Sequence, residues 1–163
     1  MRFGLFALLL LPVAEPALAE RQSLGVFFQW GAFLENAPKR CFAIAEPNRS
    51  PKPQGWQPFA SVGFWPGSGV RAQVHFRLSR RKRPGSAVLL RIDERTFQLY
   101  AGGANAWAPD PRGDAEIVAA MRSGIDMILE TRSETGAPVR DYYQLRGAAT
   151  AIDAAAVACS RRR

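Results

Sequence analysis

Apolar and polar residues alternate most regularly between positions 70 and 79. Val70, Ala72, Val74, Phe76 and Leu78 are each separated by a polar or charged residue. A period of two over this length predicts a half-buried strand whose apolar side chains point inward. Aromatic and β-branched runs bounded by turn residues predict further strands at residues 25–33, 40–45, 59–65, 87–92, 96–101, 126–132 and 139–146.

The connections between these strands are short, apart from a proline-rich loop at residues 47–58. Residues 80–85, Asp93-Glu94 and residues 133–138 have the composition of turns. Short turns join antiparallel neighbours and cannot join parallel ones. We therefore expect an antiparallel meander in which the strand at 70–79 is followed directly by its partner at 87–92.

Helical periodicity occurs twice in the second half of the chain. Asp114 is the expected cap of a helix that ends at Gly124, and a second helix follows Gly147, with Thr150 and Asp153 resembling a capping box. The apolar faces of these helices consist of Ile117, Ala120 and Met121 in the first and of Ile152, Ala155, Ala156 and Cys159 in the second. The expected fold class is α+β, mainly β: an antiparallel, sandwich-like sheet with two short helices.

The first nineteen residues have the layout of a secretory signal peptide. Arg2 precedes an apolar run, and Ala17-Leu18-Ala19 supplies a small-x-small cleavage site before Glu20. The run is too short to span a bilayer, and no later segment is long and apolar enough to do so. We therefore expect residues 1–19 to be cleaved and residues 20–163 to form a single exported domain. Its expected location is the periplasm or the cell surface of a Gram-negative bacterium.

The chain has two cysteines, Cys41 and Cys159. In an oxidising compartment an even cysteine count favours a disulfide, which here would close nearly the whole mature chain. The alternative is a pair of buried free thiols that act as small hydrophobic side chains. Redox catalysis is disfavoured because catalytic cysteine pairs usually lie close together in sequence.

Positive charge is the most prominent surface property, with 22 Lys and Arg against 14 Asp and Glu and a net charge of +8. Clustered Lys and Arg side chains attract polyanions. After export, the candidate ligands are lipopolysaccharide, anionic lipid headgroups and acidic glycans. A nucleic acid is disfavoured by the export signal. The alternative is that the charged residues in the turn at 80–85 protect the edges of the sheet from aggregation. The candidate polyanion-binding residues are Arg71, Arg77, Arg80, Arg81, Lys82, Arg83 and Arg91, with a further cluster at residues 161–163. Of these, Arg71, Arg77 and Arg91 are expected to share the solvent face of the sheet, and residues 80–83 to form the tip of the hairpin.

No motif in the sequence indicates catalysis. His75 is the single histidine, on the polar side of the strand at 70–79, and no Gly-x-Ser-x-Gly motif accompanies it. With one histidine and two cysteines, no metal site is expected, and no cofactor motif is present. We expect a non-enzymatic protein. The alternative is a hydrolase whose site is assembled from residues far apart in sequence.

Three short motifs resemble the invasion-associated locus B family of exported bacterial proteins. The motifs are Gly85-x-x-Val88-x-Leu90-x-Ile92-Asp93, the helix end at residues 120–124 and the closing segment Tyr143-x-Leu145-x-Gly147-Ala148-Ala149-x-Ala151-Ile152. Trp30 and Cys41 also match the start of that family's mature domain. The resemblance implies a mainly β, non-enzymatic domain that is periplasmic or associated with the cell surface. Our leading hypothesis is an exported structural or interaction domain that binds an envelope component or a partner protein.

Overall fold

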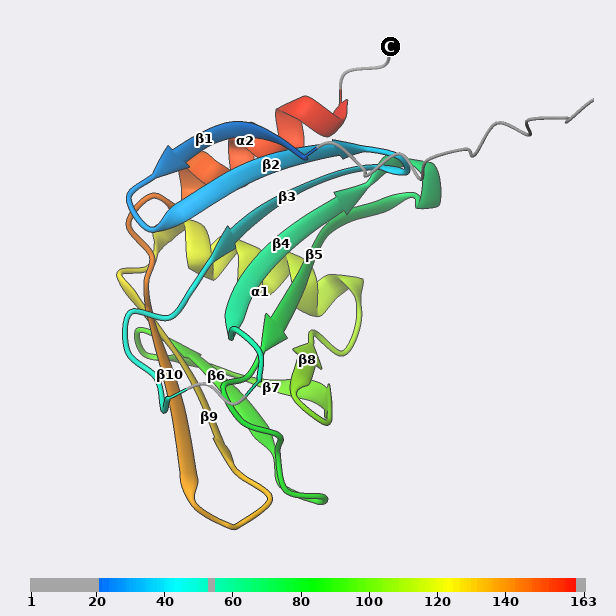
Figure 1. Cartoon of the computed structure of the whole chain (residues 1–163). Coiled ribbons are helices and arrows are strands. Elements are labelled where there is room, and N and C mark those ends of the chain that lie inside the picture. Colours follow the sequence, from blue (N-terminus) through cyan, green and yellow to red (C-terminus); the bar gives the residue numbers. More distant parts are fainter. Residues whose placement is uncertain (1–20, 53–54, 161–163) are drawn as a thin grey trace, which may run out of the picture.

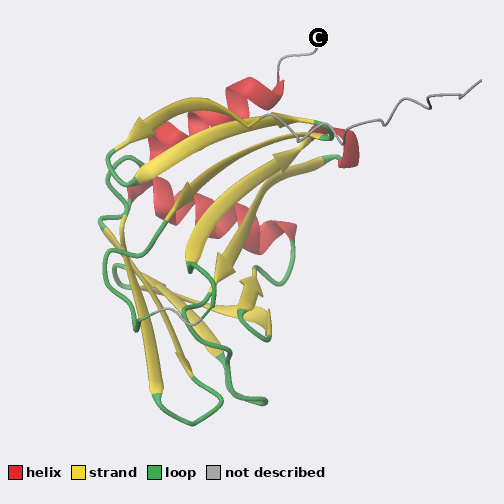
Figure 2. Cartoon of the chain, viewed as in Figure 1, coloured by secondary structure: helices red, strands yellow, loops and turns green. Residues whose placement is uncertain are grey.

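The computed structural model describes residues 21–52 and 55–160. Within these residues, ten strands form one sheet in the order β1-β2-β3-β4-β5-β8-β7-β6-β9-β10, and all recorded strand pairings are antiparallel. Two α-helices accompany the sheet (Figure 1; Figure 2). The expected fold class, α+β and mainly β, is thereby confirmed. The strands are β1 (Arg21–Phe27), β2 (Trp30–Asn36), β3 (Lys39–Ala45), β4 (Phe59–Trp65), β5 (Val70–Arg77), β6 (Val88–Ile92), β7 (Arg95–Gly102), β8 (Asn105–Trp107), β9 (Asp126–Arg132) and β10 (Pro138–Gln144).

Strand β7 connects the two halves of the sheet. Its first part pairs with β6, while Tyr100, Ala101 and Gly102 pair with β8, which in turn pairs with β5. Figure 1 shows the strands β1–β5 as an upper layer and β6, β9 and β10 as a lower one. The sheet is therefore continuous in hydrogen bonding but turned between its halves.

Both helices lie on the same face of the upper layer, α1 (Pro111–Ser123) against β5 and α2 (Ala148–Ser160) against β1–β4. Along β2, Trp30, Ala32 and Leu34 point toward the helices and are buried, while Gly31 and Phe33 point away. We call the helix-covered side the inner face and the opposite side the outer face. In Figure 1 both helices lie behind the upper layer, and the outer face carries neither of them.

The expected strand at residues 25–33 is wrong, because these residues form a hairpin. Phe28 and Gln29 make the turn between β1 and β2, and Phe28 has a positive φ of 57°. The aromatic run contains no Pro, Asn or Asp at this point, so composition gives no turn signal. The proline-rich loop and the strand at Phe59–Trp65 agree with the prediction, as do the β6–β7 and β9–β10 hairpins.

The expected meander between β5 and β6 is also wrong. These strands do not pair with each other: β5 pairs with β4 and β8, and β6 pairs with β7 and β9. The three-residue strand β8, which the sequence analysis missed, lies between β5 and β7. Residues 80–83 are consequently a crossing segment between the two halves of the sheet and not the tip of a hairpin.

The two helices begin earlier than predicted. Asp110, and not Asp114, caps α1, since its side chain accepts a hydrogen bond from the Gly113 amide. Asp114 instead accepts a hydrogen bond from the Val74 backbone N–H at 2.8 Å and so joins α1 to β5. Helix α2 starts at Ala148, which places Thr150 inside the helix and excludes the proposed capping box.

Candidate binding surfaces

A disulfide joins Cys41 on β3 to Cys159 near the end of α2, across 118 positions of sequence. The predicted bridge is confirmed. Its two cysteines are buried together with Leu34 and Ala155, so the bridge holds α2 against the inner face. None of the described cysteines is free.

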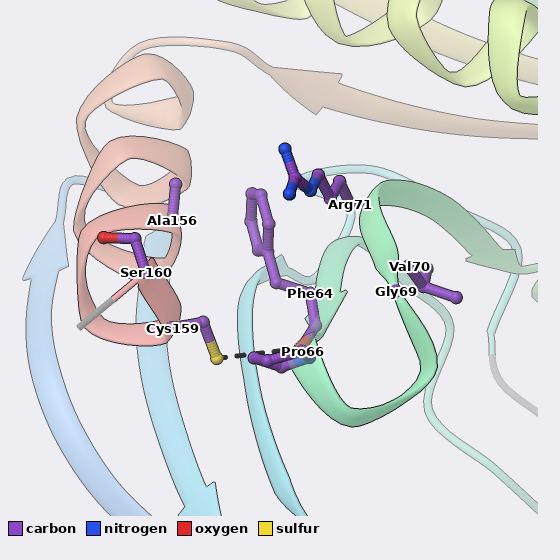
Figure 3. Close-up of a pocket in the computed structure, with 8 residues that line it drawn as sticks. All are labelled: Phe64, Pro66, Gly69, Val70, Arg71, Ala156, Cys159 and Ser160. Carbon is purple, nitrogen blue, oxygen red and sulfur yellow. Dashed lines mark hydrogen bonds between the residues drawn. The ribbon is translucent and has the colours of Figure 1, made fainter. Parts of the chain in front are cut away.

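Arg71 does not lie on the outer face, where the alternation of residues 70–79 placed it. The β4–β5 register shifts between Gly63 and Trp65, and Ala72 has a positive φ of 57°. This bulge inserts an extra residue into β5 and turns Arg71 toward the inner face. Figure 3 shows its side chain on the same side as Phe64 of β4.

Arg71 lines a pocket of about 470 Å³ between the end of α2 and the β4–β5 connection (Figure 3). Phe64 and Ala156 form facing apolar walls, and Cys159 lies at one side. Among the described residues Arg71 has no ion pair and no hydrogen-bonded partner. The pocket therefore combines apolar walls with one uncompensated guanidinium.

The basic segment at residues 80–83 runs along the β9–β10 turn and is bonded to it through the backbone. The Arg83 amide donates to the Arg132 carbonyl at 2.8 Å, and the Lys82 amide donates to the Gly103 carbonyl at 2.8 Å. Arg81 is paired with Glu134 at 3.0 Å. These backbone hydrogen bonds connect the segment both to the β9–β10 turn and to the β7–β8 turn. Polyanion binding by Arg80, Arg81, Lys82 and Arg83 stays a prediction.

The remaining predicted cations, Arg77 and Arg91, lie apart from each other. Arg77 is on β5 and its guanidinium lies over the ring of Trp56 at 5.4 Å. Arg91 is on β6, in the other half of the sheet, 3.9 Å from a carboxylate oxygen of Glu130. The expected common face of Arg71, Arg77 and Arg91 is wrong, because the bulge at Ala72 turns Arg71 to the inner face and Arg77 and Arg91 lie on strands that do not pair. Residues 161–163 lie outside the described part of the chain.

His75 lies within a row of rings on the outer face. It stacks on Trp107 with ring centroids 5.1 Å apart and planes 4° from parallel, and its Nε2 lies 3.0 Å from Oδ1 of Asn105. Burial lowers the pKa of His75, and the nearby Arg77 charge acts in the same direction, while the hydrogen bond to Asn105 opposes them. The imidazole is therefore held in a neutral, stacked state.

A carboxylate and two guanidinium groups meet at one corner of the outer face. Glu35 of β2 accepts a hydrogen bond from Nε of Arg21 at 2.9 Å and another from Nε of Arg40. The Arg40 and Arg21 hydrogen bonds hold the pKa of Glu35 below its usual value, against the opposing effect of burial. The cluster was not predicted, because the unrecognised β1–β2 turn is what pairs Arg21 with Glu35, and the β2–β3 pairing then brings Arg40 opposite the same carboxylate.

No protein-family model matches the sequence, and no curated protein matches it. Among solved structures, the fold is similar to the crystal structure of invasion associated protein B from Bartonella henselae, with a TM-score of 0.62. The two chains are 17% identical, and the alignment covers 86% of this chain and 99% of the other. They share a fold. The resemblance seen in the sequence motifs is supported at this level, as a distant relationship.

The residues that carry this resemblance are buried in the core or closely packed against neighbouring elements. Val88, Leu90 and Ile92 are buried in β6. A Cβ at Gly124 would lie 2.8 Å from a methyl carbon of Ile92, and one at Gly147 would lie 2.1 Å from the carbonyl oxygen of Phe27. The motifs therefore describe how the fold packs and contain no chemistry of their own.

Two kinds of feature are absent from the described residues: a metal-binding cluster and a membrane-spanning helix. Within residues 21–52 and 55–160 no cluster of three His, Cys, Asp or Glu side chains is arranged to hold a metal ion. In the same ranges no helix is long and apolar enough to cross a membrane.

Proposed function

We propose that this protein is an exported, non-enzymatic interaction domain of the bacterial cell envelope. In this proposal residues 1–19 direct export and are removed, and residues 20–163 act as one domain that contacts an envelope component or a partner protein. The observation that carries the proposal is the Cys41–Cys159 disulfide, because disulfides form and persist in oxidising compartments. The similarity in fold to an invasion associated protein supports it.

An interaction role fits the side chains of the molecule better than a hydrolytic one. The one imidazole, His75, stacks on Trp107 and is hydrogen-bonded to Asn105, and among the described residues no carboxylate or hydroxyl is hydrogen-bonded to its ring. Arginines and aromatic rings at the surface, in contrast, are the side chains most enriched at binding hot spots.

The test is to locate the protein in a Gram-negative host and to determine its covalent state. We expect the chain in the periplasmic or envelope fraction, with the intact mass of oxidised residues 20–163. Replacing Leu9 and Leu10 with Arg interrupts the apolar run and is expected to leave full-length chain with two reactive thiols in the cytoplasm. Full-length wild-type protein in the cytoplasm with both thiols reduced would overturn the proposal.

A further inference from the structure

The outer face of the sheet carries aromatic side chains, from β2 across to β7, that neither helix covers. We call this group the aromatic face. Among its members, Tyr100 is 70% exposed, and the others are partly exposed. The group consists of Phe33, Phe42, Phe59, Trp65, Tyr100 and Trp107.

Five of the six rings make ring contacts, in two groups. In the first group, Phe33 on β2 lies 5.7 Å from Phe42 on β3, and the second group is built around His75. Tyr100 on β7 lies 6.4 Å from Trp107 on β8, which stacks on His75 on β5. Phe59 on β4 meets His75 edge-on at 5.1 Å. Since neighbouring strands lie about 4.8 Å apart, the face extends roughly 24 Å from β2 to β7.

Two rings of the aromatic face lie directly over glycines. A Cβ at Gly63 would lie 2.3 Å from the ring of Trp65, and one at Gly31 would lie 2.7 Å from the ring of Phe33. The absence of a side chain at these two positions lets the rings lie down on the sheet. The face of the Trp65 ring that turns away from Gly63 points outward, while the guanidinium of Arg21 lies over the ring of Phe33 at 5.7 Å.

Arginine side chains lie beside the rings of the aromatic face. Arg21 lies 5.4 Å from the ring of Phe42, and Arg40 lies 5.6 Å from the same ring. Glu35 is only 8% exposed and takes Nε of both arginines, which leaves their terminal Nη groups without a hydrogen-bonded partner among the described residues. We call Arg21 and Arg40 the arginine pair. Arg77 lies on the same face, so the guanidinium groups named here outnumber the carboxylate of Glu35 that pairs with two of them.

We propose that the aromatic face binds a glycan strand whose sugar rings carry carboxylates. The C–H-bearing side of a sugar ring stacks against the negative face of an aromatic ring, and the Nη groups of the arginine pair receive the carboxylates in planar, two-point contacts. The size of the face suits several consecutive sugar units. This inference concerns the isolated domain and does not depend on whether the chain is exported.

The distribution of charge favours this occupant over a second copy of the chain. An interface between two copies would bring together two surfaces with the same excess of guanidinium groups, because the same patch of both copies forms a two-fold interface. A carboxylated glycan neutralises these cations and also stacks on the rings between them. A large partly apolar surface of this kind is unusual on a monomer without a ligand.

The experiment is a calorimetric titration of the oxidised domain with short polygalacturonate oligomers, repeated with the methyl-esterified form of the same oligomers. We expect binding to the free acid, at least tenfold weaker binding to the ester, and a decrease in affinity as salt is raised. Tyr100→Ala is expected to weaken binding about tenfold without unfolding the protein, because this side chain is largely exposed.

The contribution of the arginine pair to binding is tested with a variant that also removes Glu35, so that no buried carboxylate is left without its partners. Replacing Arg21, Glu35 and Arg40 together with Gln removes the whole cluster and is expected to abolish the preference for the free acid over the ester. Arg112→Gln is the matched control, since Arg112 lies on α1, away from the outer face, and should bind as the wild type does.

Three results would overturn the inference. These are no binding of the free acid, equal affinity of the Tyr100→Ala variant and the wild type, and equal effects of Arg112→Gln and the triple substitution. Sedimentation that shows a dimer which Tyr100→Ala dissociates would assign the aromatic face to a second copy. Each of these outcomes leaves the export experiment unaffected, so failure of one proposal does not obscure the other.

Discussion

Removal of the disulfide tests the main constraint on the fold. The bridge closes a loop across 118 positions, and the chain-entropy relation for a loop of this length gives about 5 kcal/mol at 25 °C. Domains of this size have a total stability of roughly 5–15 kcal/mol. At roughly 2–4 °C per kcal/mol, we expect the melting temperature to fall by about 10–20 °C.

The assay compares Cys41→Ala, Cys159→Ala and the double variant by urea and thermal unfolding. Loss of either cysteine opens the same loop, so the three variants should lose nearly the same free energy of unfolding. Wild-type protein in reductant should match them. If the cysteines only fill space in the core, the two single losses would instead add up in the double variant, and reductant would have no effect. That additive result would refute the reasoning.

Two further predictions concern single side chains. Burial raises the pKa of Asp141 against the lowering effect of its hydrogen bonds to Ser79. This carboxyl therefore stabilises the fold at a pH below its unfolded pKa, and the contribution is lost as the pH rises through the folded pKa. Asp141→Asn should make the melting temperature depend less on pH between pH 4 and pH 8. Ala72→Gly should raise the free energy of unfolding by up to about 1 kcal/mol, because glycine accepts the positive φ at the bulge. A wild-type pH profile in the first variant, or a clear loss of stability in the second, would contradict these assignments.

Local periodicity predicted the elements whose signal lies within a few residues. Phe59–Trp65 is a strand with the expected bounds, and the terminal helix buries Ile152, Ala155 and Cys159 as its spacing indicated. These predictions succeed because side chains alternate along a strand and repeat every 3.6 residues along a helix. Neither relation depends on which other element lies nearby.

Strand partners and side-chain direction depended on information outside each local pattern. The β5–β8 pairing joins Phe76 to Ala106, across a stretch that contains two other strands. Nothing in residues 70–79 marks the bulge at Ala72 that redirects Arg71. Because of these two errors, arginines that were predicted to share one face lie at separate places in the structure. The predicted binding site is therefore not assembled, although most strands were predicted correctly.

The location of the aromatic face has a physical cause in the composition of α2. This helix is built largely of alanine, and it packs on Ala43 and neighbouring alanines of the inner face. Small side chains on both surfaces let the helix and the sheet approach closely, as close packing requires. The larger residues of β3, such as Phe42, therefore alternate to the outer face. Hydrophobicity alone would assign Phe42 to the core and Ala43 to the periphery, whereas size reverses the assignment and leaves the aromatic rings available for a ligand.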